Sequence, residues 1–114
     1  MEAGERTLRE LTQADTYPDV KAEAYYRLGM RKLGAKPPDL SGGFALLRKS
    51  IELFPDAPTL LEAGRCAIEK KEWAAARGYL DQLLREFPRA DRECVEQAQQ
   101  LRRKVMEAEA GSAR

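Results

Sequence analysis

The sequence predicts an all-α protein of about six helices, organised as a single domain over residues 1–110 with a disordered tail at 111–114. Three observations support this fold class. Apolar residues recur at spacings of three and four in six segments, which is the pattern of an amphipathic helix. Proline and glycine fall between those segments, and the hexamers ELFPDA at 52–57 and REFPRA at 85–90 nearly repeat after 33 residues. No segment alternates polar and apolar residues between turn signals, so we expect no strand.

The three helices expected in the N-terminal half lie at 5–16, 20–33 and 42–54. The first has only two apolar residues, one turn apart, whereas the other two have broad apolar faces. These faces consist of Leu8 and Leu11; of Ala24, Tyr25, Leu28, Met30 and Leu33; and of Phe44, Leu47, Ile51 and Phe54. Neighbouring helices are expected to cover them, because apolar surface gains free energy on leaving water.

The three helices expected in the C-terminal half lie at 59–70, 73–87 and 91–109. Their apolar faces consist of Leu60, Leu61, Ala63, Cys66, Ala67 and Ile68; of Trp73, Ala76, Leu80, Leu83, Leu84 and Phe87; and of Cys94, Ala98, Leu101, Val105 and Ala108. The last helix is expected to cap the array. Its polar residues are expected to face water, and they include Gln97, Gln100, Arg103 and Lys104.

Capping residues and prolines mark the helix boundaries. The side chains expected to accept a free backbone N–H at a helix start are those of Asp19, Ser41, Asp56 and Asp91. The pairs Tyr17-Pro18, Phe54-Pro55 and Phe87-Pro88 are each expected to end the preceding helix, because proline lacks an N–H and clashes with the preceding turn. Gly34 is expected to end the second helix in a left-handed conformation.

The two hexamers belong to a longer internal repeat. Leu47 aligns with Leu80 at an offset of 33, and Gly29 aligns with Gly64 at an offset of 35, because the segment AKPPDLS at 35–41 carries two extra residues. One unit is therefore a helix, a turn and a second helix. Such a period is typical of helical repeat proteins, in which one unit cannot bury its apolar face alone.

Small residues recur where the two helices of a unit are expected to touch. Gly29 with Gly43, and Gly64 with Ala76, would let antiparallel backbones approach closely. The aromatic rings of Phe54 and Phe87 are then expected to pack between one hairpin and the next.

Three features of the sequence carry a resemblance to a known family: YYRLGM at 25–30, AGRCAIEKKEWAAARGYLDQLLREFP at 63–88, and the prolines after Phe54 and Phe87. Together they resemble the tetratricopeptide repeat (TPR) family. The residues at the family's signature positions in the second unit are Gly64, Trp73, Ala76, Leu80 and Pro88. The resemblance covers about residues 16–90 and implies a TPR-like α-α superhelix: two helical hairpins flanked by an N-terminal helix and a C-terminal capping helix. The chain departs from the family pattern at its aromatic positions, which are Tyr25, Lys32, Leu60 and Ala67 here.

Composition argues against several classes of partner. The net charge is +1 and is spread evenly, and RRK at 102–104 is shorter than a nucleic-acid patch, so we interpret it as a solvated helix face and expect no nucleic acid. Cys66 and Cys94 have no metal-binding or redox spacing and are interpreted as small buried hydrophobes, which suits a reducing, cytoplasmic location. No apolar run approaches the ~18 residues of a membrane span, so membrane insertion is not expected.

Catalysis is not expected either. The chain has no histidine, the commonest general base and metal ligand, and no glycine-rich phosphate loop. The acidic pairs Glu69 with Glu72 and Glu93 with Glu96 have the spacing of helical neighbours and are interpreted as solvated charges. We therefore expect no catalytic residue, no metal site and no cofactor.

The remaining candidate site is a binding surface. In a superhelix of helical hairpins the first helix of each unit lines the concave side, and repeat proteins bind their partners there. The expected partner-binding residues are Tyr26, Arg27 and Met30 on helix 20–33 and Leu61, Glu62, Arg65 and Glu69 on helix 59–70. They predict a non-catalytic scaffold or adaptor that binds a peptide or an amphipathic helix of another protein.

Other interaction roles are compatible with the same surface. The opening TYPDVKAEAYYRLG at 16–29 is similar to envelope-assembly members of the family, which implies an interaction domain of an envelope-assembly or secretion component. A self-association module, forming a homo-oligomer, is a further alternative. Organelle-fission adaptors share the six-helix plan but carry a C-terminal membrane anchor. The clamp of chaperone-tail-binding members uses asparagine, which this chain lacks.

Overall fold

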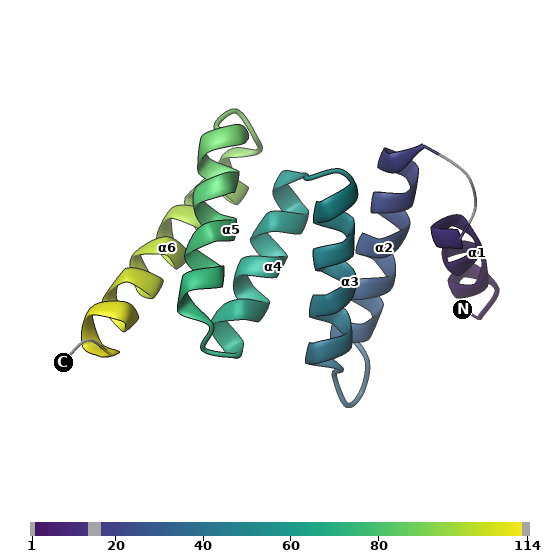
Figure 1. Ribbon diagram of the computed structural model, residues 1–114, viewed down its shortest axis with the longest axis horizontal. Helices are drawn as coiled ribbons and strands as arrows, with labels where there is room; N and C mark the ends of the chain where they lie inside the picture. Colours follow the sequence, from purple (N-terminus) through teal and green to yellow (C-terminus); the bar gives the residue numbers. More distant parts are fainter. Residues whose placement is uncertain (1, 14–16, 113–114) are drawn as a thin grey trace. The chain divides into compact units, whose positions relative to one another are not determined.

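A computed structural model describes residues 2–13 and 17–112. Over these residues the protein is entirely helical, which confirms the predicted all-α class with its six helices (Figure 1). The helices are α1 (Glu2–Gln13), α2 (Pro18–Leu33), α3 (Leu40–Leu53), α4 (Ala57–Glu69), α5 (Trp73–Glu86) and α6 (Arg92–Ser112). The tail expected at 111–114 begins inside α6, and its last two residues lie outside the described part of the chain.

The chain divides into two compact units, residues 1–55 and residues 56–114. The N-terminal unit holds α1, α2 and α3, and the C-terminal unit holds α4, α5 and α6. The division falls inside the first hexamer, between Pro55 and Asp56, and each unit contains one of the two helical hairpins that the repeat predicts.

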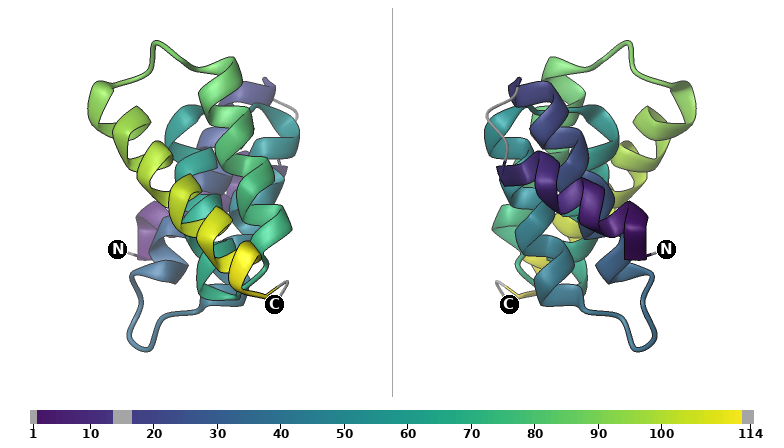
Figure 2. Two further views of the ribbon diagram at one scale, coloured as in Figure 1. Left: turned by 90° about the vertical axis from the view of Figure 1, so that its left-hand side faces the viewer. Right: turned by 90° about the vertical axis from the view of Figure 1, so that its right-hand side faces the viewer.

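In the N-terminal unit, α2 and α3 form an antiparallel hairpin and α1 packs on α2 (Figures 1 and 2). The helix pair meets at two glycines, as the repeat predicts. A Cβ placed on Gly29 would lie 3.1 Å from the carbonyl oxygen of Gly43, and a Cβ on Gly43 would lie 2.7 Å from Cγ of Leu33. The two backbones therefore approach at a distance that side chains at these positions would prevent.

A buried hydrogen bond joins the far ends of the same hairpin. The hydroxyl of Ser50, near the end of α3, donates to the carbonyl oxygen of Ala22 in the first turns of α2 at 2.6 Å. Both residues are buried, so the bond satisfies a hydroxyl that would otherwise be costly to remove from water.

In the C-terminal unit, α4 and α5 form the second antiparallel hairpin, and α6 packs against both (Figure 2). Leu60, Leu80 and Leu83 are completely buried, as are the small Ala98 and the β-branched Val105 of α6. Residues that the repeat aligns share this burial. Leu47 and Leu80 are each 0% exposed, and Gly29 and Gly64 are both buried.

The close contact in this hairpin differs in detail from the expected one. A Cβ placed on Gly64 would meet Leu80, whose Cδ2 would lie 2.9 Å away, rather than Ala76. Gly64 therefore makes room for a leucine side chain, whereas Gly29 makes room for the backbone of a second glycine.

Two of the four expected N-caps are wrong. α2 begins at Pro18 with Tyr17 as its N-cap, which places Asp19 inside the first turn, because proline is favoured at the first helical position. α3 is capped by Asp39 and not by Ser41, and the Asp39 carboxylate accepts a hydrogen bond from the Gly42 amide at 2.9 Å. Asp56 caps α4 as expected. Asp91 directly precedes α6 and its carbonyl oxygen accepts from the Val95 amide.

The left-handed residue lies after α4 and not after α2. Gly34 has φ −87°, so its expected left-handed cap is wrong; the loop instead turns back so that the Asp39 amide donates to the carbonyl oxygen of Lys32. Lys71 has φ +59°, and the amides of Lys71 and Glu72 donate to carbonyl groups of the last turn of α4. This is a Schellman closure made without glycine.

The expected burial of Phe54 is also wrong, because the residue is 52% exposed. Phe54 is the C-cap of α3, and its backbone is already extended, with φ −161°, so it no longer follows the helical periodicity of the apolar face. Phe87, its equivalent in the repeat, is half-buried.

A pair of glycine substitutions tests whether close backbone approach holds the first hairpin together. We expect Gly43→Ala to lower the free energy of unfolding by about 1–3 kcal/mol, because the added methyl group overlaps Leu33 and the Gly29 carbonyl group. Gly78→Ala is the matched control. Nothing lies within 4 Å of a Cβ at Gly78, so this change should stabilise α5 by up to about 1 kcal/mol. Urea unfolding followed by circular dichroism measures both, and equal effects of the two substitutions would contradict the close contact.

Candidate functional site

The seven predicted partner-binding residues lie in different units. Tyr26, Arg27 and Met30 belong to α2 in the N-terminal unit. Leu61, Glu62, Arg65 and Glu69 belong to α4 in the C-terminal unit. Each set is described in turn, beginning with α2.

On α2, Tyr26 and Met30 are half-buried and Arg27 is exposed. The guanidinium of Arg27 lies 2.9 Å from the carboxylate of Glu23, one turn earlier. Arg27 also borders a pocket of about 350 Å³ between α1 and α2, whose apolar walls include Leu8 and Leu11. The N-terminal helix therefore contributes to the surface at Arg27, which the sequence did not indicate.

On α4, the four predicted residues differ in burial: Leu61 is buried, Glu62 is half-buried, and Arg65 and Glu69 are exposed. Leu61 is only 7% exposed and offers a partner little surface. Arg65 and Glu69 are exposed and face α6, and together with it they line a cleft of about 300 Å³. We call this surface the α4–α6 face, and it consists of Arg65, Ile68, Glu69, Gln97, Gln100, Leu101 and Lys104.

Polar contacts cross the α4–α6 face at one end. The Arg65 guanidinium donates to the side-chain oxygen of Gln97 and lies 3.9 Å from the carboxylate of Glu62. The side-chain amide of Gln97 in turn donates to Glu93 at 3.2 Å. Arg65 is therefore oriented by both helices.

The rest of the α4–α6 face combines exposed polar side chains with half-buried apolar side chains, which we call its apolar floor. Gln100, Lys104 and Glu69 are exposed, whereas Ile68 and Leu101 are half-buried beneath them. An amide side chain both donates and accepts hydrogen bonds, which is what an extended peptide backbone requires of its partner. The arrangement can therefore hold a peptide by its backbone, by a charged side chain and by an apolar one.

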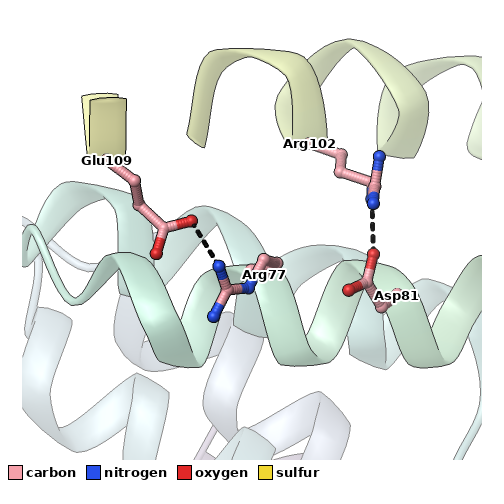
Figure 3. A network of polar contacts seen from close by, with 4 residues as sticks. All are labelled: Arg77, Asp81, Arg102 and Glu109. Carbon is pink, nitrogen blue, oxygen red and sulfur yellow. Dashed lines mark hydrogen bonds and ion pairs between the residues drawn. The ribbon is translucent and has the colours of Figure 1, made fainter. Parts of the chain in front are cut away.

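The other edge of α6 is fastened to α5 by two ion pairs (Figure 3). Arg77 of α5 lies 3.0 Å from Glu109, and Asp81 of α5 accepts a hydrogen bond from Arg102. These pairs are partly exposed, so each contributes at most about 1 kcal/mol. They lie on the edge of α6 that faces α5, and the α4–α6 face lies on the other edge.

The basic run at 102–104 is divided between the two edges of α6. Arg102 and Arg103 border a cleft of about 750 Å³ beside α5, together with Asp81 and Arg85. Lys104 borders the α4–α6 face. The run therefore does not form one face, although all three side chains reach water; that of Arg102 is 40% exposed and bonded to Asp81.

Sequence reasoning missed the contribution of α6 to the site, although a signal for it existed. The offset of 35 that aligns α2 with α4 also aligns Glu62 with Gln97, Arg65 with Gln100 and Glu69 with Lys104. Extending the repeat by one more helix would have identified these residues as part of the same surface.

The two cysteines differ in burial. Cys66 is 3% exposed, as expected, and burial together with the nearby carboxylates of Glu62 and Glu69 raises its pKa to about 11. Cys94 is only half-buried, so its expected burial is wrong. Burial and then the carboxylate of Asp91 raise the pKa of the Cys94 thiol above its ordinary value. Both are free thiols.

Within the described residues, no three histidine, cysteine, aspartate or glutamate side chains are grouped so that they could bind a metal ion. In the same part of the chain, none of the helices is both long and apolar enough to span a membrane.

No protein-family model matches the chain, and no curated protein or solved structure matches it. The geometry described above is therefore the basis on which a function can be proposed.

The raised pKa of Cys66 predicts a pH dependence of stability. Because the folded pKa lies above the unfolded one, the thiol favours the folded state fully below pH 9.0, and this contribution is lost as the pH rises towards 11. We expect the free energy of unfolding to fall between about pH 8 and about pH 10.5, and to fall less steeply in Cys66→Ala. Urea titrations of both proteins across this range measure the difference. Parallel curves for the two would contradict the assignment.

Proposed function

We propose that the protein is a non-catalytic, TPR-like interaction scaffold of the cytoplasm that binds a peptide segment of another protein. The observation that carries the proposal is the α4–α6 face, where two neighbouring helices present amide and charged side chains above an apolar floor. Recognition of an extended segment uses this combination: hydrogen bonds supply affinity, and pockets for individual side chains supply specificity.

The repeat supports the TPR-like assignment. Two antiparallel hairpins with aligned buried positions, each with a glycine where its helices are closest, are the units that such a superhelix stacks. α6 contacts both helices of the preceding hairpin, as the first helix of a following unit would. The α4–α6 face then corresponds to a surface lined by first helices.

The balance of charge on the α4–α6 face indicates the character of the ligand. Arg65 and Lys104 are basic and Glu69 is acidic, so the face suits a segment of mixed polarity with at least one carboxylate. Arg65 is held by Gln97 and Glu62 before a ligand arrives, which reduces the entropy lost when it binds a carboxylate. Ile68 and Leu101 would contact an apolar residue of the same segment.

Selection from a library of random peptides tests this function. Peptides selected on the wild-type protein should bind the double variant Gln100→Ala, Lys104→Glu about tenfold more weakly, a loss of about 1.4 kcal/mol. Fluorescence anisotropy of the labelled peptides measures the dissociation constants, and circular dichroism verifies that helicity is unchanged.

The matched control is Gln99→Ala, Arg103→Glu, which makes similar changes on the edge of α6 that faces α5. Its affinity should stay within about twofold of wild type. The function would be wrong if no peptide were selected, or if both double variants weakened binding equally. The further variant Tyr26→Ala, which changes α2 alone, shows whether α2 contributes to the same ligand.

A further inference from the structure

In the C-terminal unit, the second hexamer, REFPRA at 85–90, forms part of a pocket. A pocket of about 640 Å³ lies where α5 ends and α4 and α6 begin. We call it the FP pocket, after the Phe-Pro pair of the second hexamer, and it is lined by Asp56, Ala57, Pro58, Glu86, Phe87, Pro88, Arg89, Ala90, Asp91 and Cys94. It shares no residue with the α4–α6 face.

The walls of the FP pocket are apolar. Pro58 comes from the first turn of α4, Phe87 and Pro88 from the end of α5 and the loop after it, and Cys94 from the first turn of α6. Neither proline has an N–H to hydrogen-bond, and Phe87 and Cys94 are half-buried with part of their surface available. A concave apolar surface with a few polar groups at its edge is the usual form of a ligand site.

The rim of the FP pocket is acidic. Asp56, Glu86 and Asp91 supply three carboxylates and Arg89 supplies one guanidinium, although the chain as a whole carries a net charge of +1. Arg85 lies 3.5 Å from Glu86 and neutralises it only weakly, because both side chains are exposed. The helix dipoles also contribute. The N-termini of α4 and α6 each carry roughly half a positive charge, which offsets part of the negative charge of the carboxylates, and the C-terminus of α5 adds roughly half a negative charge.

The pKa of Cys94, which lines the FP pocket, is raised first by burial and in part by the carboxylates of the rim. After burial, the largest influences that raise the pKa of Cys94 are the carboxylates of Asp91 and Asp56. The thiol is therefore held in its neutral form, and a cation placed at the rim would be stabilised by the same carboxylates.

We propose that the FP pocket binds an apolar side chain of a partner protein that is flanked by lysine or arginine. The apolar walls of the pocket accept the side chain, and Asp56, Glu86 and Asp91 pair with the basic neighbours. Charge complementarity selects this occupant over an acidic or neutral one, since like charges at the rim would oppose binding. This inference does not rest on the ligand of the α4–α6 face.

The test uses a dye-labelled peptide, Gly-Lys-Lys-Phe-Lys-Lys-Gly, and two relatives of it. In one relative serine replaces phenylalanine, and in the other glutamate replaces every lysine. We expect fluorescence anisotropy to show binding of the first peptide and at least about tenfold weaker binding of both relatives. Amide NMR shifts should appear at residues 87–94. Equal binding of the glutamate peptide, or shifts confined to 97–104, would overturn the inference, and the latter result would still support the proposed function.

Protein variants test the acidic rim directly. The triple variant Asp56→Asn, Glu86→Gln, Asp91→Asn should weaken binding of the lysine peptide by about tenfold, because three favourable charge pairs are lost. Asparagine caps helices as well as aspartate does, so α4 and α6 should keep their starts. A triple control with the same charge change, at residues that do not line the pocket, is Glu10→Gln, Glu52→Gln, Glu107→Gln. Equal weakening by the two triple variants would overturn the inference.

Blocking the FP pocket provides an independent readout. N-ethylmaleimide reacts with the thiolate, so the raised pKa of Cys94 slows the reaction, and prolonged incubation followed by mass spectrometry establishes that modification is complete. Cys66 is 3% exposed and should remain unmodified in the folded protein. We expect the modified protein to lose binding of the lysine peptide, and Cys94→Ser to bind it with or without the reagent. Unchanged binding after complete modification of Cys94 would contradict occupation of the pocket.

Discussion

Close approach of two antiparallel helices at a glycine is the constraint on which each half of the molecule depends. The two hairpins meet it in different ways. At Gly29 and Gly43 the absence of both side chains lets backbone lie against backbone, whereas at Gly64 the space is filled by Leu80 of the facing helix. Both solutions keep the helices near enough for Leu47 and Leu80 to be fully removed from water. This burial supplies more stabilisation than any surface ion pair of the structure can.

The same constraint determines where a binding surface can form. α6 contributes Ala98 and Val105 to the core, and small side chains at this contact let it lie close to α4 as well as α5. With these two residues turned into the core, the ion pairs Arg77–Glu109 and Arg102–Asp81 lie on the edge of α6 that faces α5 (Figure 3). Gln100 and Lys104 are thereby directed to the side on which α4 presents Arg65. The α4–α6 face is thus a consequence of packing on the opposite side of α6.

The sequence predicted the fold well where one interaction dominates. Helical periodicity gave all six helices, and the repeat correctly paired Gly29 with Gly43, because apolar burial and steric fit decide these features. Helix starts were less predictable. Asp39 rather than Ser41 caps α3, since both residues could accept the free N–H and only the path of the preceding loop distinguishes them.

The exposure of Cys94 and the contribution of α6 to the α4–α6 face were missed because both depend on how neighbouring helices are placed. Cys94 has the spacing of a core residue, but it lies in the first turn of α6. Neighbouring helices cover it only in part there, so it is half-buried. Periodicity along one helix says which residues share a face, and it does not say how far the facing helix extends. The residues of α6 that complete the α4–α6 face could have been found only by extending the repeat beyond its second hairpin.

The two hexamers show how a repeat can conserve packing while local structure diverges. Three residues, 54–56, separate α3 from α4, and Phe54 is 52% exposed there. Five residues, 87–91, separate α5 from α6, and the Ala90 amide donates to the carbonyl oxygen of Phe87 at 3.1 Å. The longer connection turns back on the backbone of Phe87 and supplies Ala90 to the lining of the FP pocket and Asp91 to its acidic rim. The two nearly identical hexamers therefore end α3 and α5 in the same way. The length of the loop that follows then decides whether the phenylalanine stays on the surface, as Phe54 does, or lines a pocket, as Phe87 does.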